Sequence, residues 1–432
     1  MTGPGDRLLS LDDALGRMLT GIDPLPPVEV PVGGILGYVL ARDITARHTL
    51  PPWDDSAMDG YAVRSDDVTT ASAARPVSLR VIGEVAAGHQ ATDEVMPGTA
   101  VRILTGAMLP PGADAVVRVE DTDAAEGVAA LPEQVEIRVA VVPGTAVRPA
   151  GSDVRQGDLV LPGGSVMAPH RIGALVAAGY GTAPVHPRPR VAILSTGDEL
   201  VPAGEPLGRA GVPDSSSAAL AAQVIEAGGE VTSLGIARDD RQDIIERLRR
   251  GLDSAEIIVA SGGVSVGAHD EVRLAFEAIG RIDLWRVAIQ PGKPLVFGRA
   301  TARDGRNVLL FGLPGNPVSS FVTFELFVRP VIRRMAGQTE ASGRTIVRAR
   351  LADQARTDPA RRAFLRVRLT TDPQGQPIAT LAGGQGSHML SGLAAADGLA
   401  IVPEGVGVLE AGAEVDVIRL EPGSGRSERD RA

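Results

Sequence analysis

The chain has 432 residues, of which 44% are hydrophobic and 22% are charged. This length suggests about three domains, and the apolar content is enough for real cores, which excludes a wholly disordered protein. The formal net charge of −10 makes the chain a poor general binder of nucleic acid or of membrane surfaces. Any anion that it binds must therefore be held by a local basic site.

Cysteine is absent from the sequence. Disulfides, cysteine zinc sites, iron–sulfur clusters and a thiol nucleophile are therefore excluded. The first 19 residues contain no basic segment followed by an apolar stretch, and no apolar run approaches the ~18 residues that a membrane span needs. We therefore expect a soluble cytoplasmic protein.

The basic side chains include a single lysine, Lys293, among 43. Lysine offers a compact point charge, whereas arginine offers a planar fork. Pro291, Gly292 and Pro294 surround Lys293 and fix the backbone there, and an ammonium held in this way suits a compact oxyanion. This position favours a functional Lys293 over a chance survivor of a compositional bias toward arginine.

The first predicted element is an amphipathic helix over 8–19. Leu11, Leu15 and Met18 recur at helical spacing, and Ser10 is placed to cap the helix. The proline-rich stretch that follows is more typical of extended segments than of helix.

A β domain is predicted over 53–145, because short β-branched runs alternate there with glycine and proline turns. The expected strands lie at 77–82, 100–104, 115–119 and 135–142.

The segment 188–335 alternates strands with helices, which predicts a parallel α/β sheet with crossover connections. The expected strands lie at 191–194, 231–236, 256–260, 294–298 and 308–311. The expected helices lie at 218–227, 241–252, 271–279 and 317–335.

Residues 345–420 return to β structure, with a small barrel or a sandwich as the two possibilities. The strands are expected at 346–351, 364–369, 378–381, 399–402 and 415–420. The polar tail over 421–432 is predicted to be disordered. The fold class is therefore a multidomain α/β and β protein, in which a mostly-β N-terminal region over 1–187 and the C-terminal β domain flank a central α/β domain.

Three loops of the α/β domain follow predicted strands, at 195–199, 261–267 and 312–317. Ligands of open α/β sheets bind beyond the carboxyl ends of the strands, and glycine loops at helix N-termini favour anions. Asn316 and Pro317 are expected at the N-cap and first helical positions. One glycine turn is usually structural, but three in one sheet, two of them beside acids, favour a phosphate and cation site.

Acidic side chains near these loops are candidate magnesium ligands, since Mg²⁺ typically needs only one or two carboxylates besides phosphate and water. The candidates are Asp198, Glu199, Asp239, Asp240 and Asp270. Helix capping before Arg241 is an equally good explanation of Asp239 and Asp240. His269 is a possible ligand or base, although a surface loop histidine is commoner.

Other polar clusters lie outside the α/β domain. Asp59, within Ser-Ala-Met-Asp-Gly-Tyr-Ala, is by itself a turn residue, and Gly-Ser-His at 386–388 is a further small-residue loop. A basic run around Phe364 is either an anion site or, more commonly, a solvated strand face; it consists of Arg361, Arg362, Arg366 and Arg368.

Common motifs of covalent catalysis, of nucleotide binding and of zinc catalysis are missing from the sequence. It has no Gly-x-Ser-x-Gly elbow, no Walker loop and no paired-histidine zinc helix. No side chain stands out as a covalent nucleophile. An enzyme of this kind would position a nucleophile brought by its substrate and stabilise the charge that develops.

Several long motifs in collinear order carry a family resemblance. They occupy 56–62, 83–88, 102–107, 111–117, 195–200, 261–267, 291–294 and 312–317. Over about residues 7–420 the chain resembles the molybdopterin molybdenumtransferases, the MoeA and gephyrin E-domain family.

The resemblance implies a reaction and its partners. Adenylylated molybdopterin and molybdate would be the substrates, the dithiolene would take up the metal, and AMP would be released with the help of Mg²⁺. It also implies an elongated homodimer, with transient contacts to the molybdopterin adenylyltransferase and to molybdoenzyme-maturation proteins. No nucleic acid or membrane partner is expected.

The resemblance also implies the site residues. The catalytic set would be Asp59, Thr105, Asp153, Glu199, Lys293, Arg361 and Ser387. Cofactor-binding residues would be Thr196, Gly197, Ser261, Gly262, Gly263, Ser265, Pro294, Pro314, Gly315 and Asn316. The metal ligands would be Asp198, Asp239 and Asp270.

The chain departs from the family pattern at a few positions. Gln290 stands where the family often has lysine and Ser216 where asparagine is usual, while Ser152, Ala268 and His269 also differ. Two alternative functions remain: adenylyl transfer to molybdopterin and a gephyrin-like scaffold. The flanking β segments argue against the first, and the second needs further domains and linkers that we do not expect.

Overall fold

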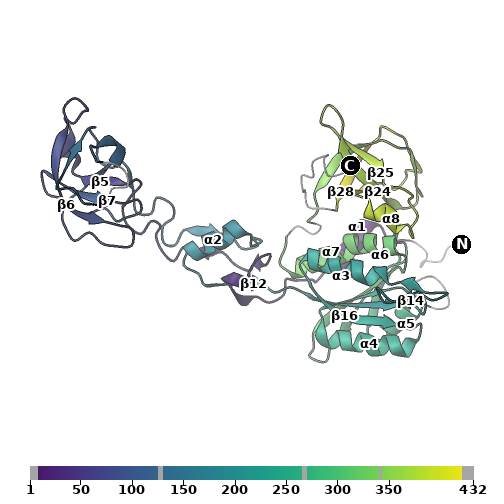
Figure 1. Ribbon diagram of the computed structural model, residues 1–432. Coiled ribbons are helices and arrows are strands. Elements are labelled where there is room, and N and C mark those ends of the chain that lie inside the picture. Colours follow the sequence, from purple (N-terminus) through teal and green to yellow (C-terminus); the bar gives the residue numbers. More distant parts are fainter. Residues whose placement is uncertain (1–7, 125–129, 265–269, 340–342, 421–432) are drawn as a thin grey trace. The chain divides into compact units, whose positions relative to one another are not determined.

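The computed structural model describes residues 8–124, 130–264, 270–339 and 343–420 (Figure 1). They divide between two compact units. The inserted unit consists of Pro31–Leu36 and Arg42–Ala183, and the main unit consists of Met1–Val30, Gly37–Ala41 and Pro184–Ala432. Each unit is described by itself below.

A five-stranded sheet forms the larger part of the inserted unit. Its strands, in spatial order, are β8 (Ala115–Arg118), β5 (Gly60–Val63), β7 (Thr99–Ile103), β6 (Val77–Val85) and β9 (Gln134–Ile137). Tyr61, Leu79 and Val117 are buried in its core. The predicted β domain is therefore present, but β5 lies in the stretch that we expected to be a turn.

The rest of the inserted unit contains short strand pairs and one helix. The pairs are β3 (Ile44–Thr45) with β11 (Leu159–Leu161) and β4 (Asp55–Ser56) with β10 (Val147–Arg148). Helix α2 (Pro169–Ala177) has a proline in its first turn, where the missing N–H costs nothing. Sequence periodicity did not predict this helix.

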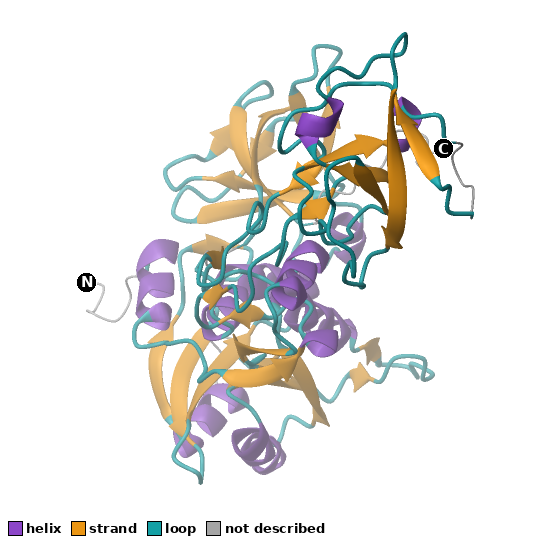
Figure 2. Ribbon diagram, turned by 90° about the vertical axis from the view of Figure 1, so that its left-hand side faces the viewer, coloured by secondary structure: helices purple, strands orange, loops and turns teal. Residues whose placement is uncertain are grey.

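The main unit opens with α1 (Leu11–Leu19), which Ser10 caps by accepting from the Asp13 N–H at 3.1 Å, as predicted. Its central sheet has six strands, with helices on both faces (Figures 1 and 2). In spatial order the strands are β16 (Glu230–Ala237), β13 (Arg190–Thr196), β17 (Ile257–Ser261), β21 (Asn307–Leu313), β20 (Val296–Thr301) and β18 (Arg281–Trp285).

Two hydrophobic cores cover the faces of this sheet. Ile193 of β13 packs in one core with α1, α3 (Ser215–Ala227) and the helical segment that begins at Pro317. The neighbouring Leu194 packs in the other core with α4 (Arg241–Ser254) and α5 (Glu271–Ile279). Alternate residues of a strand point to opposite faces, so one buried apolar run serves both cores.

Only part of the central sheet is parallel. The four strands from β16 to β21 are parallel, as predicted, whereas β20 and β18 are antiparallel to their neighbours. A turn of a few residues joins β20 to β21, and so short a connection produces an antiparallel hairpin rather than a crossover. Strand β18 was not predicted.

The last helix of this domain is continuous but changes its winding. It consists of α6 (Pro317–Thr323), a π-helical turn η4 (Phe324–Val328) and α7 (Arg329–Met335). Pro330 has no N–H to donate to the carbonyl four residues earlier, which accounts for a local change of hydrogen-bonding pattern at this point.

Five C-terminal strands close into a barrel, which resolves the choice between barrel and sandwich. Around the barrel they are β24 (Arg362–Thr371), β25 (Pro377–Leu381), β22 (Ile346–Leu351), β28 (Glu414–Arg419) and β26 (Gly398–Val402), which pairs again with β24. Closure leaves no free sheet edge. The short strand β19 (Ile289–Gln290) pairs with β24 in parallel. Helix α8 (Leu390–Ala394) follows the loop after β25.

Short elements complete the described chain. They are β1 (Val28–Pro31), β2 (Val39–Leu40), β12 (Thr182–His186), β14 (Leu200–Val201), β15 (Val212–Pro213), β23 (Ala355–Arg356) and β27 (Val408–Leu409), with 3₁₀ turns η1 (Val32–Gly34), η2 (Ser65–Val68) and η3 (Val119–Asp121). The expected fold class, a central α/β domain with flanking β domains, is confirmed.

Candidate functional site

A cavity of about 900 Å³ opens where β13, β17 and β21 end. The described parts of all three glycine loops line it, so they face one space rather than separate directions. The predicted residues that line the cavity are Thr196, Gly197, Glu199, Asp239, Ser261, Gly262, Gly263, Pro294, Pro314, Gly315 and Asn316. Ser265, which was also predicted, lies outside the described residues.

Glycine is required where the loops after β13 and β17 meet. Gly262 has φ +99°, and a Cβ there would lie 2.5 Å from the carbonyl oxygen of Thr196. Gly263 has φ +62°, and its Cβ would lie 2.7 Å from Val272. The left-handed conformation and the close backbone approach both exclude a side chain, so these glycines shape the cavity floor.

The loop after β21 has the expected position but a different hydrogen-bonding pattern. Asn316 is the N-cap residue of α6 and Pro317 follows it, as predicted, yet the Asn316 side chain makes no capping bond. Its Nδ2 donates instead to Ser387 Oγ at 3.0 Å. The Ser387 carbonyl accepts from the Val318 N–H at 3.2 Å, so one amide that we expected to face outward is already occupied.

Two predicted metal ligands, Asp198 and Asp239, hold each other in place. The Asp198 N–H donates to Asp239 Oδ2 at 3.4 Å, and the Asp239 N–H donates to Asp198 Oδ1 at 3.3 Å. The neighbouring Asp240 accepts from the Asp243 N–H at 2.9 Å and caps α4. The capping alternative therefore applies to Asp240, whereas Asp239 faces the cavity.

The third predicted metal ligand, Asp270, is the N-cap of α5 and is 3% exposed. One of its oxygens accepts from the Arg273 N–H at 3.2 Å, while Oδ2 accepts no hydrogen bond. Burial raises the pKa of this carboxyl. It is not among the described residues that line the cavity, and the described chain contains no group of three or more metal-ligating side chains.

Asp358 pairs with Arg361 and also feels the charge of Lys293. Asp358 accepts from the Arg361 guanidinium at 2.7 Å, and its own N–H donates to Gln290 Oε1 at 3.0 Å. The Ala360 N–H lowers the pKa of Asp358 most, followed by Arg361, with a smaller effect of the Lys293 charge. Neither Lys293 nor Arg361 is among the described residues that line the cavity.

The predicted site residues of the inserted unit are Asp59, Thr105 and Asp153. The Thr105 N–H and hydroxyl both donate to Asp59 Oδ1, each at 2.7 Å. These bonds, the hydroxyl first, lower the pKa of Asp59, so its carboxylate is ionised and preorganised. Asp153 is exposed, and its N–H donates to the Leu50 carbonyl at 3.1 Å.

Several cavity residues were missed by the sequence reasoning. They are Val212, Pro213, Asp214, Ser215 and Glu271. Leu200, Val264, Pro317 and His388 belong to segments that the sequence singled out but were not named as site residues, and Ser216, noted only as a departure, also lines the cavity. Asp214 accepts from the Ser217 N–H at 3.0 Å and starts α3, three residues before the predicted start. The Asp-Ser-Ser capping signal was therefore available in the sequence.

Comparisons with known proteins agree with this architecture. Family models match the MoeA N-terminal region (domain I and II) over 9–179, a probable molybdopterin binding domain over 192–334 and the MoeA C-terminal region (domain IV) over 348–420. Two crystal structures of the MoeA molybdopterin biosynthesis protein from Pyrococcus horikoshii superpose with TM-scores of 0.80 and 0.76, at 33% and 29% identity, covering 96% of this chain and 100% of theirs.

Curated relatives have the same extent. Molybdopterin molybdenumtransferase 2 of Mycobacterium tuberculosis is 38% identical over 90% of this chain and 94% of its own length. The molybdopterin molybdenumtransferase of Nostoc sp. is 36% identical over 89% and 86% respectively. The fold and cavity thus define a protein of the molybdopterin-binding class with MoeA-type flanking domains. The chain belongs to the molybdopterin molybdenumtransferase (MoeA) family, transferases of molybdenum cofactor biosynthesis, which confirms the resemblance.

Proposed function

We propose that this chain transfers molybdenum from molybdate to the dithiolene of adenylylated molybdopterin and releases AMP. The observation that carries the proposal is the cavity, because the described parts of three glycine loops converge there at strand ends in a chain of this family. The substrate supplies the sulfur nucleophiles, so the chain needs no nucleophilic side chain of its own.

The glycine loops form the phosphate side of the site. Gly262, Gly263 and Gly315 leave room for the backbone to approach an anion. The Gly262 N–H donates to the Leu313 carbonyl at 3.1 Å, so the amides of Gly263 and Gly315 would be the donors, without a side chain in the way. The acids on the same wall repel a bare phosphate, so a cation is needed between them.

Magnesium fits the donors at this wall. Asp239 lines the cavity with a hard carboxylate, and Asp198, which is not among the described lining residues, is hydrogen-bonded to it. One or two such ligands suffice when phosphate and water complete the shell. Bound there, Mg²⁺ would neutralise charge on the phosphate oxygens. Asp239 would hold the magnesium ion at that position, and Glu199 lines the same cavity.

The oxyanion side of the reaction belongs to Lys293, Arg361 and Ser387 in this proposal, with Pro294 on the cavity wall. The ammonium of Lys293 is exposed, which leaves it available to a compact dianion. Gln290 adds no charge here, because its amide is neutral; its Oε1 accepts from the Asp358 N–H. In the inserted unit, Asp59, Thr105 and Asp153 are proposed to serve the same reaction.

A direct assay of AMP tests the proposal. Purified protein, adenylylated molybdopterin and Mg²⁺ are incubated with and without molybdate, and AMP is quantified by chromatography. We expect release that depends on molybdate and stops with EDTA. Release that ignores molybdate, or consumption of ATP in the presence of molybdopterin, would instead indicate the adenylyl-transfer alternative.

Lys293→Ala tests the oxyanion side. We expect the KM for molybdate to rise at least tenfold while binding of the adenylylated pterin changes little, since a point charge is lost from one substrate only. Arg303→Ala is the control, because the Arg303 side chain, on the hairpin between β20 and β21, is 87% exposed and pairs only with Asp253 of α4 among the described contacts. Equal losses for both substrates would contradict the assigned role.

The resemblance further implies a homodimer in the cytoplasm, which we adopt as part of the proposal. Light scattering after size exclusion should give twice the chain mass of 44.7 kDa. In the described part of the chain, no helix combines the length and apolarity that crossing a membrane requires.

A further inference from the structure

The described part of the main unit buries charged side chains away from the cavity as well. Arg366 of β24 is 0% exposed, so the expectation of a solvated strand face is wrong for this residue. A second group of buried charges lies between α3, the helical segment η4–α7 and the start of the barrel domain. This cluster consists of Gln223, Glu226, Glu325, Arg329 and Arg344.

Arg344 is the centre of the cluster, and its guanidinium uses all five of its N–H groups. Nη1 and Nη2 donate to the two carboxylate oxygens of Glu226 at 2.6 and 2.7 Å, while Nε and Nη2 donate to those of Glu325, each at 3.0 Å. The remaining Nη1 hydrogen bond goes to the Leu420 carbonyl. Arg344 therefore holds two carboxylates at once, in the bidentate geometry that its planar fork provides.

Most of the cluster is shielded from water. The exposed fraction of the side chain is 2% for Glu325, 5% for Arg329 and 7% for Arg344, against 38% for Glu226. Gln223 Nε2 donates to Glu325 Oε1 at 2.9 Å, and Arg329 lies 3.6 Å from Glu226 and 3.9 Å from Glu325. A buried ion pair is a weak source of stability compared with apolar residues of similar volume, so its geometry is the feature to explain.

The geometry connects two domains of the main unit. Arg344 precedes β22, the first strand of the barrel, and Leu420 follows β28, its last strand in the chain. Glu226 and Glu325 belong to the α/β domain, so both ends of the barrel domain are fixed to it at one point. Apolar packing between the domains, to which Phe364 of β24 contributes, is non-directional. The directional contacts at this end of the barrel come from the Arg344 cluster.

The substrate cavity depends on how these two domains meet. Its glycine loops belong to the α/β domain, whereas His388, which also lines it, belongs to the barrel domain. We infer that Arg344 is a positioning residue, which orients the barrel on the α/β domain so that Arg361 and Ser387 stay in register with the glycine loops. Its effect on catalysis rests on the proposed function, whereas its effect on the domain boundary does not.

Arg344→Met tests the inference against Arg348→Met. Arg348 is 60% exposed on β22 and pairs only within the barrel domain, with two acids of β28. Two amides report on the boundary, because the Val318 N–H donates to a carbonyl of the barrel domain at 3.2 Å and the Arg362 N–H donates to the Ala288 carbonyl at 2.9 Å. In Arg344→Met we expect faster hydrogen exchange at both amides and unchanged exchange in β26 and β28. Arg348→Met should leave all of them unchanged.

A kinetic measurement separates positioning from general destabilisation. Arg344→Met should raise the KM for molybdate on the order of tenfold and change binding of the adenylylated pterin little, because displaced groups lose their orientation toward one substrate only. Arg344→Lys keeps the charge without the fork and should restore only part of both effects. Arg348→Met should have the KM values of the unaltered protein.

Glu226→Gln provides a second route if Arg344→Met does not fold, because Glu226 is the exposed member of the cluster and glutamine keeps its size without its charge. Unchanged exchange at Val318 and Arg362 in the folded variant overturns the inference. An equal acceleration throughout the barrel, or an unchanged KM for molybdate, overturns it as well. Faster exchange at the boundary, with no molybdate-dependent AMP release from the unaltered protein, supports the role of Arg344 there and refutes the proposed function instead.

Discussion

The carboxylate of Asp59 is held by one neighbour, Thr105, through two short hydrogen bonds. Thr105→Val removes the hydroxyl, which is the larger cause of the lowered pKa of Asp59, and keeps the N–H. We expect the pKa of Asp59 to rise toward its ordinary value in a carbon-detected NMR titration. Asp243, whose pKa is lowered by the Arg238 N–H and then by Arg247, is the internal reference and should not move.

The same bonds connect the Asp59 titration to stability. A folded-state pKa below the unfolded one contributes stability at pH values above the unfolded pKa, and this contribution is lost as the pH falls through the folded pKa. In Thr105→Val the folded pKa lies closer to the unfolded one, so this acid-side loss should be smaller and should be complete at a higher pH. An unchanged Asp59 titration would mean that the backbone N–H alone sets the pKa.

Asp270 has the opposite electrostatic situation, because burial raises its pKa. The folded state then favours the neutral carboxyl, so its stabilising contribution is present below the unfolded pKa and is lost as the pH rises through the folded pKa. Asp270→Asn keeps an acceptor for the Arg273 N–H without the charge. Relative to the unaltered protein, we expect this variant to gain stability as the pH rises from about 4 to 7.

Asp270→Ala is the matched control for capping. It removes the charge and the acceptor, and loss of an N-cap costs about 1 kcal/mol. Urea unfolding in EDTA-containing buffer measures both variants without bound metal. If asparagine destabilises as much as alanine at neutral pH, burial of the charge is not the dominant effect at this position.

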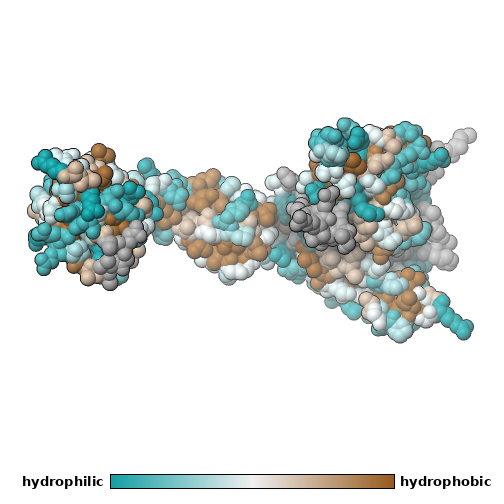
Figure 3. All heavy atoms as spheres, turned by 45° about the horizontal axis from the view of Figure 1, so that its top comes forward, coloured by the Kyte–Doolittle hydropathy of each residue, from teal (hydrophilic) through white to brown (hydrophobic). Residues whose placement is uncertain are grey.

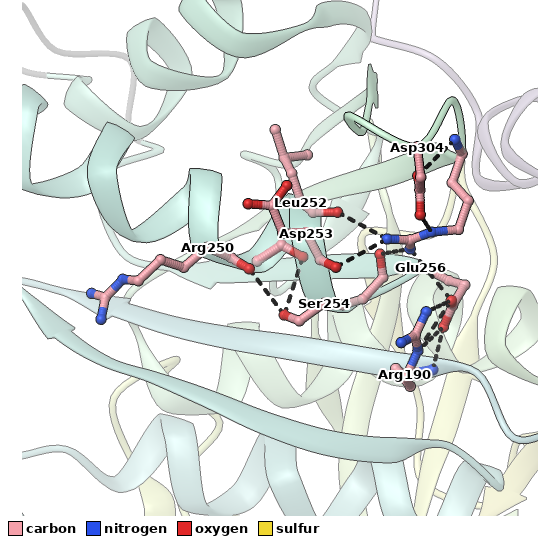
Figure 4. A network of polar contacts seen from close by, with 10 residues as sticks. Arg190, Arg250, Leu252, Asp253, Ser254, Glu256 and Asp304 are labelled. Atoms are coloured by element: carbon pink, nitrogen blue, oxygen red, sulfur yellow. Dashed lines mark hydrogen bonds and ion pairs between the residues drawn. The ribbon is translucent and has the colours of Figure 1, made fainter.

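At the scale of single elements, the side chain of Arg306 caps the C-terminal end of helix α4. It donates to the carbonyls of Ala255 at 2.9 Å, Asp253 at 3.2 Å and Leu252 at 3.3 Å, and it pairs with Glu256. Figure 4 labels Leu252, Asp253 and Glu256 of this network and shows the second pair of Glu256, with Arg190. The final carbonyls of a helix lack partners within the helix. The Arg306 guanidinium, which lies on the hairpin between β20 and β21, donates hydrogen bonds to them.

Arg306→Ala should therefore lower the free energy of unfolding of the main unit by about 2–3 kcal/mol, since it leaves helix carbonyls without a partner and removes one of the two arginines that pair with the buried Glu256. Arg303→Ala on the same hairpin is the control. Its pair with Asp253 is exposed at both ends and should be worth less than about 0.5 kcal/mol. Urea denaturation distinguishes the two, and similar small losses would show that solvent replaces the Arg306 contacts.

Elements with one strong local signal were predicted best. Helix α5 and strand β22 begin and end at the predicted residues, because apolar periodicity and capping agree there. Strands β18 and β5 were missed. The burial of β5 depends on β7 and β8, which are distant in sequence, whereas Arg281 and Asp283 of β18 are exposed. The antiparallel direction of β20 is likewise set by a turn length that periodicity does not encode.

The candidate site shows the same division. The loops after β13, β17 and β21 were predicted as one site because parallel strands end at one edge. The burial of Arg366 was not predicted, because it depends on the loop that follows the neighbouring strand β25. The local sequence also gave no reason for the Asn316 side chain to donate to Ser387 instead of capping its own helix.

At the scale of the whole molecule, apolar side chains remain exposed in both units. Figure 3 shows hydrophobic and hydrophilic residues interspersed over the face that it presents. Val142 and Leu159 of the inserted unit are 69% and 56% exposed, and Ile225 of the main unit is 62% exposed. Scattered exposure of this kind is normal, so stability must be sought in the separate cores.

Separate cores predict separate unfolding. The inserted unit buries Leu79, and the main unit buries Leu310 in a core that shares no residue with the first. Units with their own cores open as cooperative blocks, so differential scanning calorimetry should show two transitions. Leu79→Ala should lower one midpoint and Leu310→Ala the other, since each change costs its own unit about 2–5 kcal/mol.

The double variant makes this test sharp, because changes at sites without shared partners add. Both midpoints should fall by the amounts seen in the single variants. A single transition that both substitutions shift would mean that the two units unfold as one cooperative block, and the inserted unit would then depend on the main unit for its stability despite having its own sheet and core.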